Sequence, residues 1–508
     1  MTAQKTGRVS RALLLLGMGL AIPCYLFTVF NVTLSPWPLY ERSRPLLLLL
    51  TALCTAGLLL LMRCARRLAP FVVRHERAVL AAAACFYLAV QLVMACVLRF
   101  EPKTDAEQCF TAAQLLVDRG TFGDNERSFI YFTRYPHNLG LVYALAGIFR
   151  FFGLFGWGDR FMQAVLVASL LFTLGLLASA QLCKRLGGAL AQTRVLLLFA
   201  TCLPFLYCTT ELYTDCFSLA FPPVILLCAL RAQDAATRDG RVRWALLFGI
   251  ASFVGAQLRF TSVIAAAAAL LALLFSRRWR QTALCALALA LAFVLGGAAM
   301  DAETARHLSD EDIEKNELPK LHYIAMGLPV QEDQGYGQYG DGGWLIFTTS
   351  FDDPKERDAA LLEQVIDRVY TLRYPSRLLN LLSRKNLSTF GNGTFKLNEI
   401  IEADAYEPDN AVKQVIFEQG ALFPAYYHLT TALFLSQMLL MCLSCARALR
   451  RRDASCASVF ITLVGAFLFL CMWETRARYF FQFEMVLLCA GALLPEGRAK
   501  RGYAPKDN

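Results

Sequence analysis

Charged residues are scarce in this chain of 508 residues. Asp, Glu, Lys and Arg make up 18% of the sequence, 56% is hydrophobic, and the mean hydropathy is +0.44. A soluble domain of ordinary composition has about a quarter of its residues charged. Apolar runs of roughly 20 residues, the length needed to cross a bilayer, recur along the chain. The scarcity of charge therefore excludes a soluble globular protein and predicts an all-α polytopic membrane protein.

Cysteine is absent from the longest polar segment, residues 301–420, although the chain contains 17 cysteines. They lie mostly in or beside apolar runs, as Cys54, Cys85 and Cys202 do. A disulfide framework requires cysteines in segments outside the membrane. The distribution argues against such a framework and indicates that cysteine serves here as a small apolar residue.

Thirteen apolar runs are candidate membrane spans, which predicts a bundle of about 12–13 helices. A span needs roughly 20 apolar residues, and the runs differ in how well they meet this length. The candidates are residues 12–34, 45–62, 78–98, 138–155, 160–182, 194–210, 216–231, 242–257, 261–276, 281–299, 421–446, 457–473 and 480–495.

The distribution of charge predicts the orientation in the cell membrane. The net charge is +10, but residues 301–420 contain 22 acidic and 12 basic residues, so the remainder carries +20. Basic short loops stay in the cytoplasm, whereas a long acidic segment translocates freely. We therefore expect a cytoplasmic N-terminus and an extracytoplasmic active site, and the basic excess gives no reason to expect a nucleic-acid partner.

A count of membrane crossings forward from a cytoplasmic N-terminus and a count backward from a cytoplasmic C-terminus disagree by one crossing. The disagreement falls between residues 138 and 194. The weakest span in this region is 138–155, which is followed by Gly156, Trp157 and Gly158. We therefore expect about 12 full crossings and a short, re-entrant or irregular segment here.

The chain divides into four regions on this pattern. The acidic region has a helical pattern at 354–373 and a glycine-rich turn at 334–343, which predicts a mixed, mostly helical lid. The regions are an N-terminal transmembrane hairpin (1–77), a transmembrane module with a first extracytoplasmic loop at 99–137 (78–299), an extracytoplasmic lid domain (300–420), and C-terminal transmembrane helices with a cytoplasmic tail (421–508).

The first extracytoplasmic loop contains the strongest candidate for a catalytic group. Asp105 lies seven residues after the third span, close to the membrane surface, where a carboxylate can act as general base toward an acceptor hydroxyl. Glu107 is a second candidate for the same task. The structural alternative is that Thr104 and Asp105 cap a short amphipathic helix lying on the membrane.

The same loop ends in the segment YFTRYPHNLG, which contains Arg134 and His137. The planar guanidinium of arginine matches phosphate oxygens, and a histidine here can donate to a phosphate or remain a neutral cap. Arg and Tyr also anchor proteins at the headgroup level without any catalytic role. Both interpretations stand on the sequence.

Glu211 and Asp215 flank a turn between two apolar runs. Two carboxylates four residues apart can bind a divalent cation or orient an acceptor. The alternative is that Asp215 caps the next helix. Two carboxylates form an incomplete coordination shell, so a metal here would need substrate phosphates and water. Metal dependence is thus open, and no cofactor is certain.

Three arginines in turns between spans are candidates for a phosphate clamp. They are Arg259, Arg476 and Arg478, and a charge at such a position must be paired or face water. For the turn that contains Arg476 and Arg478, the alternative is an ion pair between Glu474 and Arg478 at helical spacing. His322, in the lid, is a weaker candidate for closing over a substrate.

Four motifs in this order resemble membrane glycosyltransferases of the GT-C superfamily. They are RYPHNLG, ELYTD, LRFTS and ETRARYFFQFEMVLL. The likeness covers most of residues 78–495 and is greatest to bacterial members of glycosyltransferase family 39, the group of protein O-mannosyltransferases and lipid A aminoarabinose transferases. Many relatives have two adjacent acids in the first loop, whereas here Ala106 separates Asp105 from Glu107.

The resemblance implies a GT-C-like helix bundle and a specific reaction. A sugar would move from a polyprenyl-phosphate donor to an extracytoplasmic acceptor with inversion, and the acceptor would be a glycan, a lipid or a protein of the cell envelope. Asp105 matches the family's catalytic acid by position. Arg134, Arg259, Arg476 and Arg478 would lie on the phosphate side.

A multi-pass transporter or flippase for lipid or polysaccharide is the alternative function. It would also have many spans and arginines near the membrane. Transporters, however, often contain inverted repeats and helices broken at mid-membrane. This sequence has no visible repeat, and its charges lie at the ends of spans. The sequence therefore favours the enzyme.

Overall fold

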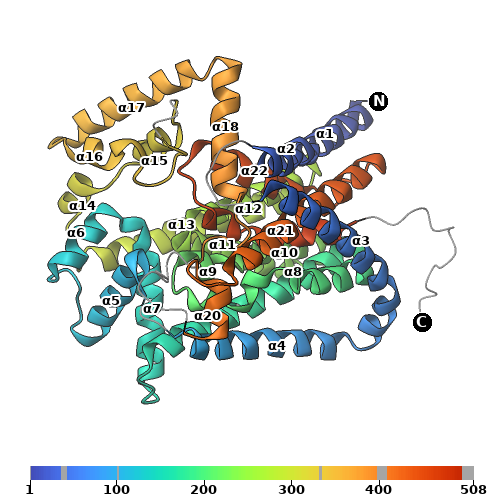
Figure 1. The fold of residues 1–508 in the computed structure, drawn as a ribbon, viewed down its shortest axis with the longest axis horizontal. Helices are drawn as coiled ribbons and strands as arrows, with labels where there is room; N and C mark the ends of the chain where they lie inside the picture. The colour runs from blue at the N-terminus through green and yellow to red at the C-terminus, as the bar shows by residue number, and fades with distance from the viewer. Residues whose placement is uncertain (1, 36–42, 100–101, 331–334, 398–408, 495–508) are drawn as a thin grey trace.

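The computed structural model describes residues 2–35, 43–99, 102–330, 335–397 and 409–494, and this part of the chain contains helices and turns but no strand. Figure 1 shows long helices running side by side and a group of shorter helices gathered at one end of the bundle. The predicted all-α architecture is confirmed.

Within the described residues, seven helical stretches are long and apolar enough to cross a membrane, and two further apolar helices are shorter. The seven are formed by α1 and α2 (Thr2–Gly19, Ala21–Leu34), α3 (Arg44–Arg74), α4 (Glu76–Val97), α8 (Arg160–Phe199), α9 and α10 (Thr214–Ser218, Phe221–Asp234), α13 (Trp279–Thr304) and α21 (Phe423–Arg450). The shorter two are η4 with α12 (Phe260–Ser262, Val263–Phe275) and α22 (Ala457–Met472). The bundle also contains five further helical segments: η2 (Leu203–Leu206), η3 (Cys208–Thr210), α11 (Arg238–Leu258), α23 (Arg478–Phe481) and α24 (Glu484–Ala492).

Helix α8 is a hairpin of two arms that reverse at Gly188. This glycine has φ +72° and ψ −171°, which ends the first arm. The rings of Phe172 and Phe199 lie 6.2 Å apart, whereas 27 residues of straight helix would separate them by about 40 Å. The spans predicted separately at 160–182 and 194–210 correspond to these two arms.

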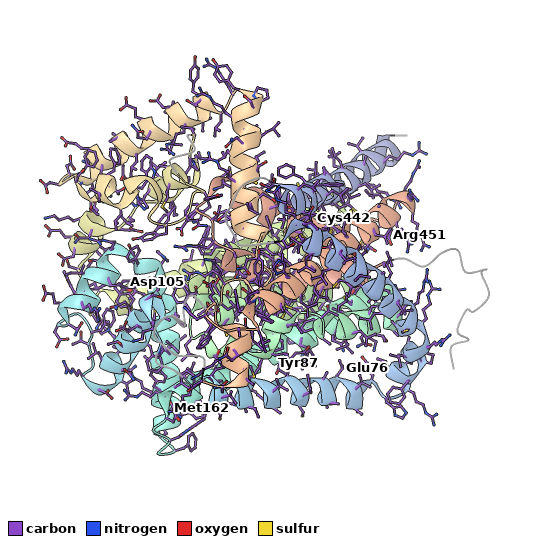
Figure 2. The ribbon with its side chains drawn as sticks, in the orientation of Figure 1. Glu76, Tyr87, Asp105, Met162, Cys442 and Arg451 are labelled. Atoms are coloured by element: carbon purple, nitrogen blue, oxygen red, sulfur yellow. The ribbon has the colours of Figure 1, made fainter. Side chains whose placement is uncertain are left out.

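Ion pairs at both ends of α4 define the two levels of the bundle. Lys184 in α8 lies 2.5 Å from Glu76 at the start of α4, and Arg99, beyond its end, lies 2.8 Å from Asp159 just before α8. The intervening 22 residues of α4 span about 33 Å, which matches the thickness of a bilayer core. Figure 2 shows Asp105 and Glu76 on opposite sides of the molecule. These levels are called the Asp105 end and the Glu76 end.

Helix α7 (Leu139–Gly153) stays at the Asp105 end. Its 15 residues extend only about 22 Å. Beyond its C-terminus, Asp159 forms an ion pair with Arg99, which follows α4. The Nη2 of Arg150 in α7 donates to the carbonyl of Leu116 in the first loop at 3.1 Å. Figure 1 shows α7 running across the direction of α4. The segment 138–155, predicted to be the irregular one, therefore does not span the bundle.

The first loop and the lid pack together over the Asp105 end. The backbone N–H of Leu318 donates to the carbonyl of Arg134, and the hydroxyls of Tyr135 and Tyr339 lie 2.6 Å apart. The first loop contains α5 (Thr104–Asp118), α6 (Glu126–Arg134) and η1 (Pro136–Asn138), and the lid contains α14 (Asp310–Asn316), α15 (Lys320–Gly327), η6 (Asp341–Gly343), α16 (Trp344–Thr349), α17 (Pro354–Thr371), α18 (Pro375–Phe390) and α20 (Ala411–Ile416).

The helix predicted at 354–373 is α17, but its apolar side is only partly covered. Leu361 is fully buried in a small core with Trp344, whereas Ile366 and Val369 are exposed. The glycine-rich turn is confirmed for residues 335–343, where five glycines have positive φ; residue 334 lies outside the described residues.

Candidate active site

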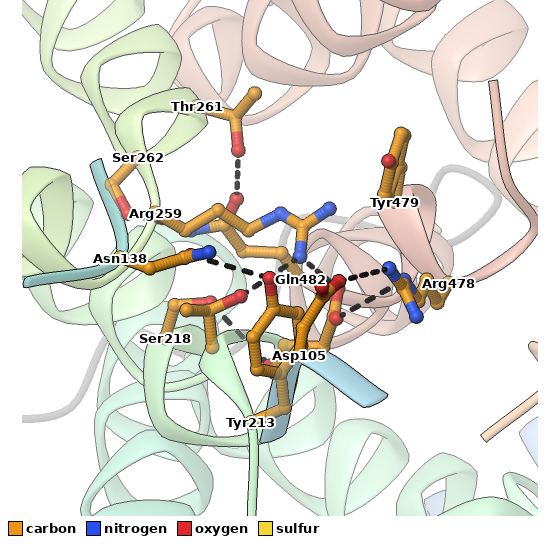
Figure 3. Close-up of polar contacts among 12 residues, drawn as sticks. Asp105, Asn138, Tyr213, Ser218, Arg259, Thr261, Ser262, Arg478, Tyr479 and Gln482 are labelled. Carbon is orange, nitrogen blue, oxygen red and sulfur yellow. Dashed lines mark hydrogen bonds and ion pairs between the residues drawn. The ribbon is translucent and has the colours of Figure 1, made fainter. Parts of the chain in front are cut away.

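A polar cluster at the Asp105 end is assembled from five segments that are far apart in the sequence. It contains Asp105 of α5, Asn138 of η1, Asp215 of α9, Arg259 before η4 and Arg478 of α23. Figure 3 shows the polar ends of Asp105, Asn138 and Arg259 directed into one space, with Arg478 facing Asp105. Asp105 and two of the four predicted arginines, Arg259 and Arg478, therefore converge in the fold.

Asp105 points into this cluster from the first turn of α5. Its Oδ1 accepts the hydroxyl proton of Tyr131 at 2.9 Å, and its Oδ2 lies 3.7 Å from the Nη2 of Arg478. The side chain remains 40% exposed. Lys103 occupies the N-cap of α5 and no side chain caps this helix, so the capping interpretation of Thr104 and Asp105 is wrong.

The backbone just before Asp105 is strained. Thr104 has φ +53°, in the left-handed region that β-branched residues avoid. Holding a non-glycine residue there costs about 1–3 kcal/mol, and such strain is concentrated at functional sites.

Asp215 is a charge partner for two arginines. Its Oδ1 pairs with the Nη1 of Arg259, its Oδ2 lies 3.7 Å from the Nε of Arg478, and the side chain is fully buried. Tyr213 occupies the N-cap of α9 and no side chain caps that helix, so the predicted capping role of Asp215 is also wrong. The buried carboxylate holds both guanidinium groups in place.

The two guanidinium groups lie against aromatic rings. Arg259 is centred 4.7 Å from the ring of Tyr479, and Arg478 lies 5.4 Å from the ring of Tyr213. Arg478 contacts both carboxylates at 3.7 Å, which is longer than the 2.7–2.9 Å typical of a charge-assisted hydrogen bond. Its Nε is buried without a hydrogen-bond partner among the described residues. A buried guanidinium donor of this kind is suited to an incoming anion.

A chain of three neutral groups supports the Asp105 carboxylate. Tyr213 donates to the Oδ1 of Asn138 at 3.2 Å, and the Nδ2 of Asn138 donates to the hydroxyl of Tyr131 at 2.8 Å. Burial raises the pKa of Tyr131, so its hydroxyl remains protonated and donates to Asp105. Sequence analysis assigned no role to these three residues, although Tyr131 and Asn138 lie in the segment YFTRYPHNLG and Tyr213 lies in ELYTD.

We expect Asn138→Ala to lower the turnover number of the predicted sugar transfer roughly tenfold while leaving the KM for the predicted donor unchanged. Loss of one hydrogen bond in a network to a charged group is worth about 1.5 kcal/mol, and here it releases Tyr131 from its orientation toward Asp105. Steady-state kinetics of the purified protein would measure the effect. The matched control is Asn316→Ala on the exposed surface of the lid, and equal kinetics for the two variants would contradict a positioning role for Asn138.

Glu474 is a third carboxylate near the cluster. It is buried and accepts the hydroxyl proton of Tyr479 at 2.5 Å. Burial raises its pKa, and the charges of Arg478 and Arg476 oppose that rise. Arg478 itself contacts Asp105 and Asp215, so the Glu474–Arg478 alternative describes only a longer-range attraction.

His137 borders the cluster and is neutral. Its side chain is accessible to water, yet protein atoms surround it, with the ring of Tyr323 at 6.2 Å. The protein atoms packed around the ring are the main cause that lowers its pKa; Asp105 opposes this fall and Arg259 adds to it. A neutral imidazole at physiological pH can donate one hydrogen bond without adding charge.

Four other predicted residues are held elsewhere or contribute only indirectly. Glu107 pairs with Arg127 at the surface at 3.4 Å, and His322 contacts the hydroxyl of Thr348 at 2.6 Å inside the lid. Arg134 links α6 to the lid through its backbone. Glu211 is buried one turn before Asp215. Their proposed roles at the substrate remain predictions.

The donor set at Asp215 fits guanidinium better than a metal ion. Both of its oxygens face arginines, and Glu211 is the nearest acid in the sequence. In the part of the chain that the structure describes, no group of three or more His, Cys, Asp or Glu side chains is arranged to hold a metal ion. The divalent cation suggested by Glu211 and Asp215 therefore gains no support from this geometry.

Two solved structures of ArnT from Cupriavidus metallidurans are similar to this chain. The structure bound to undecaprenyl phosphate has 14% identity and a TM-score of 0.37, covering 82% of this chain and 78% of ArnT. The apo structure has 14% identity and a TM-score of 0.39, covering 83% and 78%. Scores this low do not establish a shared fold by themselves.

The search among curated proteins found no match to this sequence. A family comparison gives a match over residues 42–497, which includes most of the membrane bundle, the polar cluster and the lid. The chain therefore belongs to the family described as conserved hypothetical integral membrane protein.

Proposed function

We propose that this protein is a membrane glycosyltransferase that moves a sugar from a polyprenyl-phosphate donor to an acceptor hydroxyl at the extracytoplasmic face. The observation that carries the proposal is the contact between Asp105 and Arg478. A partly exposed carboxylate and a buried guanidinium with an unused donor meet at one membrane level. A general base and a phosphate ligand are the two groups that this reaction needs.

Asp105 acts as the general base in this proposal. Tyr131 occupies its Oδ1, whereas its Oδ2 faces the guanidinium of Arg478 at a distance too long for a strong hydrogen bond. Once Arg478 turns toward a phosphate, Oδ2 is free to accept the proton of an acceptor hydroxyl. Glu107 is a weaker candidate, because it pairs with Arg127 at the surface.

Arg478 and Arg259 stabilise the departing phosphate. The acceptor oxygen forms a bond to the anomeric carbon while the bond from that carbon to the phosphate oxygen breaks. The acceptor proton passes to Asp105, and the electron pair leaves on polyprenyl phosphate. Attack and departure on opposite sides of one carbon invert its configuration. Cations aimed at the charge that develops on the leaving group stabilise this transition state.

The surroundings of the cluster suit a lipid-linked donor. It lies at the end of the bundle opposite the Glu76 end, where the basic loops place the cytoplasm, and a polyprenyl chain could remain in the bilayer beside it. His137 is a neutral donor at its edge, and Arg134 and Arg476 belong to the two segments that border it. The sugar and the acceptor are open.

Product analysis separates this enzyme from the alternative transporter. The purified protein would be incubated in proteoliposomes with a labelled polyprenyl-phosphate sugar and a cell-envelope extract. The proposal expects label in a new glycosidic product and release of polyprenyl phosphate in equal amounts. Movement of labelled lipid between leaflets with no new glycosidic bond would instead establish a flippase and overturn the proposal.

A further inference from the structure

A large hollow lies beside the polar cluster but on the other side of α5. Its volume is about 1470 Å³, and its walls are α5, α7, the turn after α7 and the start of α8. Phe110, Gln114 and Val117 line it from one face of α5, at helical spacing. At 100° per residue, Asp105 projects roughly 140° away from Phe110. The hollow is therefore distinct from the candidate active site.

The hollow lies at the level where the bundle meets the Asp105-end membrane surface. Arg99, which follows α4, and Asp159, which precedes α8, are both in its wall. The adjoining turn exposes large apolar side chains: Leu154 is 81% exposed and Phe155 is 72% exposed. Apolar residues at this depth are covered by acyl chains in a bilayer, so the hollow opens where lipid headgroups lie.

The wall of the hollow is basic and aromatic. It contains Arg99, Arg150 and Arg160 against a single acid, Asp159. Arg99 pairs with Asp159, and Arg160 is held by Asp118. These contacts fix two of the guanidinium groups in position before any ligand binds, which reduces the entropy lost on binding.

Arg150 presents donors to the same space. Its Nη2 donates to the carbonyl of Leu116, and a guanidinium has five N–H donors, so others remain for a ligand. Phe149 and Phe161 lie under the guanidinium groups of Arg160 and Arg99, at 5.7 and 5.8 Å from the ring centres. Trp157 also lines the hollow. Arginines above aromatic rings at the membrane surface match a phosphate attached to acyl chains.

We propose that this hollow binds the phosphate headgroup of an anionic membrane phospholipid, whose acyl chains lie along Leu154 and Phe155. The bound lipid connects α5, which carries Asp105, with α7 and α8 at the membrane surface. The proposal does not depend on the activity at Asp105, because it concerns a separate site and predicts lipid binding in the absence of any reaction.

Retention of lipid by the purified full-length protein tests the proposal. The protein in neutral detergent would be titrated with phosphatidylglycerol or with phosphatidylcholine of the same chains, and bound lipid counted by native mass spectrometry. We expect phosphatidylglycerol to bind and to raise the melting temperature. Equal retention of the two lipids would overturn the proposal.

Two substitutions locate the bound lipid. Arg150→Gln removes a donor, and Gln114→Glu adds a negative charge to the wall without removing an arginine. Each is expected to weaken phosphatidylglycerol binding roughly tenfold, the effect of one charge-assisted contact. Because Gln114→Glu leaves the arginine contacts intact, it remains informative if Arg150→Gln fails to fold. Arg373→Gln, on the exposed surface of the lid, is the matched control and should bind as the wild type does.

Competition with polyprenyl phosphate tests whether the hollow is instead the binding site of the sugar donor. This lipid carries the same phosphate chemistry, so it is added as a competitor to the protein already loaded with phosphatidylglycerol. Retention of phosphatidylglycerol supports a separate phospholipid site. Its displacement by an equimolar amount of polyprenyl phosphate, or unchanged binding in Gln114→Glu, would overturn the proposal.

Discussion

Asp105→Asn is expected to abolish most sugar transfer while leaving the protein folded. Loss of a general base lowers the rate by roughly 10²–10⁴-fold. The amide is isosteric with the carboxylate, and its oxygen can still accept the hydroxyl proton of Tyr131. In the wild type the hydroxyl oxygen of Tyr131 lies 2.9 Å from Oδ1 of Asp105. The side chain caps no helix and is partly exposed, so little stability depends on its charge. Transfer from a labelled polyprenyl-phosphate sugar measures the rate.

Glu107→Gln is the matched control for this experiment. It removes a carboxylate two residues away in the same helix, whose contact is the exposed pair with Arg127. Exposed pairs of this kind contribute about 0–1 kcal/mol, so stability and transfer should both stay near the wild-type values. Full activity of Asp105→Asn, or an equal loss in Glu107→Gln, would show that Asp105 is not the base.

The sequence predicted the positions of the apolar helices well because their signal is local. Each predicted run overlaps helix in the structure, and the doubtful segment at 138–155 was identified by its length and its glycines, but only seven stretches of the described residues are long and apolar enough to cross a membrane, fewer than the crossings predicted. The separate spans predicted at 160–182 and 194–210 anticipated the reversal of α8 at Gly188. Hydropathy and charge bias depend on composition within one window, so tertiary contacts are not needed to detect them.

The partners of the polar groups could not be predicted in the same way. Asp215 was a candidate metal ligand in the sequence, whereas in the fold it pairs with Arg259, 44 residues away, and with Arg478. The local sequence around a carboxylate beside a span does not differ between a metal ligand and an ion-pair partner of arginine. Only the approach of α9, η4 and α23 in space decides which cation it receives.

The supporting network of Asp105 was invisible for a related reason. Tyr131 and Tyr213 are aromatic residues near membrane surfaces, where tyrosine is common as an anchor. Their hydroxyls acquire a role only because Asn138 bridges them. Asp105 and Arg478 could be singled out because a charge at a membrane boundary is costly, whereas a neutral hydroxyl or amide there carries no such signal.

Arg478→Gln is expected to reduce transfer by roughly 10²–10³-fold, the usual effect of removing one donor that stabilises charge in the transition state. Charge develops on the phosphate as the sugar leaves, so the turnover number should fall more than the KM for the donor rises. Arg478→Lys keeps the charge but lacks the planar fork, and it should recover only part of the loss. Arg476→Gln, two residues earlier in the same segment, is the matched control and should have a much smaller effect.

Stability and catalysis at Arg478 can be separated with Asp215. Removing one partner of a buried ion pair costs about 3–5 kcal/mol, and less is expected here because Asp215 still faces Arg259. The double variant Asp215→Asn with Arg478→Gln removes both charges but also the carboxylate that pairs with Arg259, so no gain in thermal stability over Arg478→Gln is expected. Under the proposed mechanism the double variant still lacks the guanidinium that contacts phosphate, and its transfer stays low. If transfer returned in the double variant, Arg478 would serve only to balance the charge of Asp215, and the phosphate would have to be held by other groups.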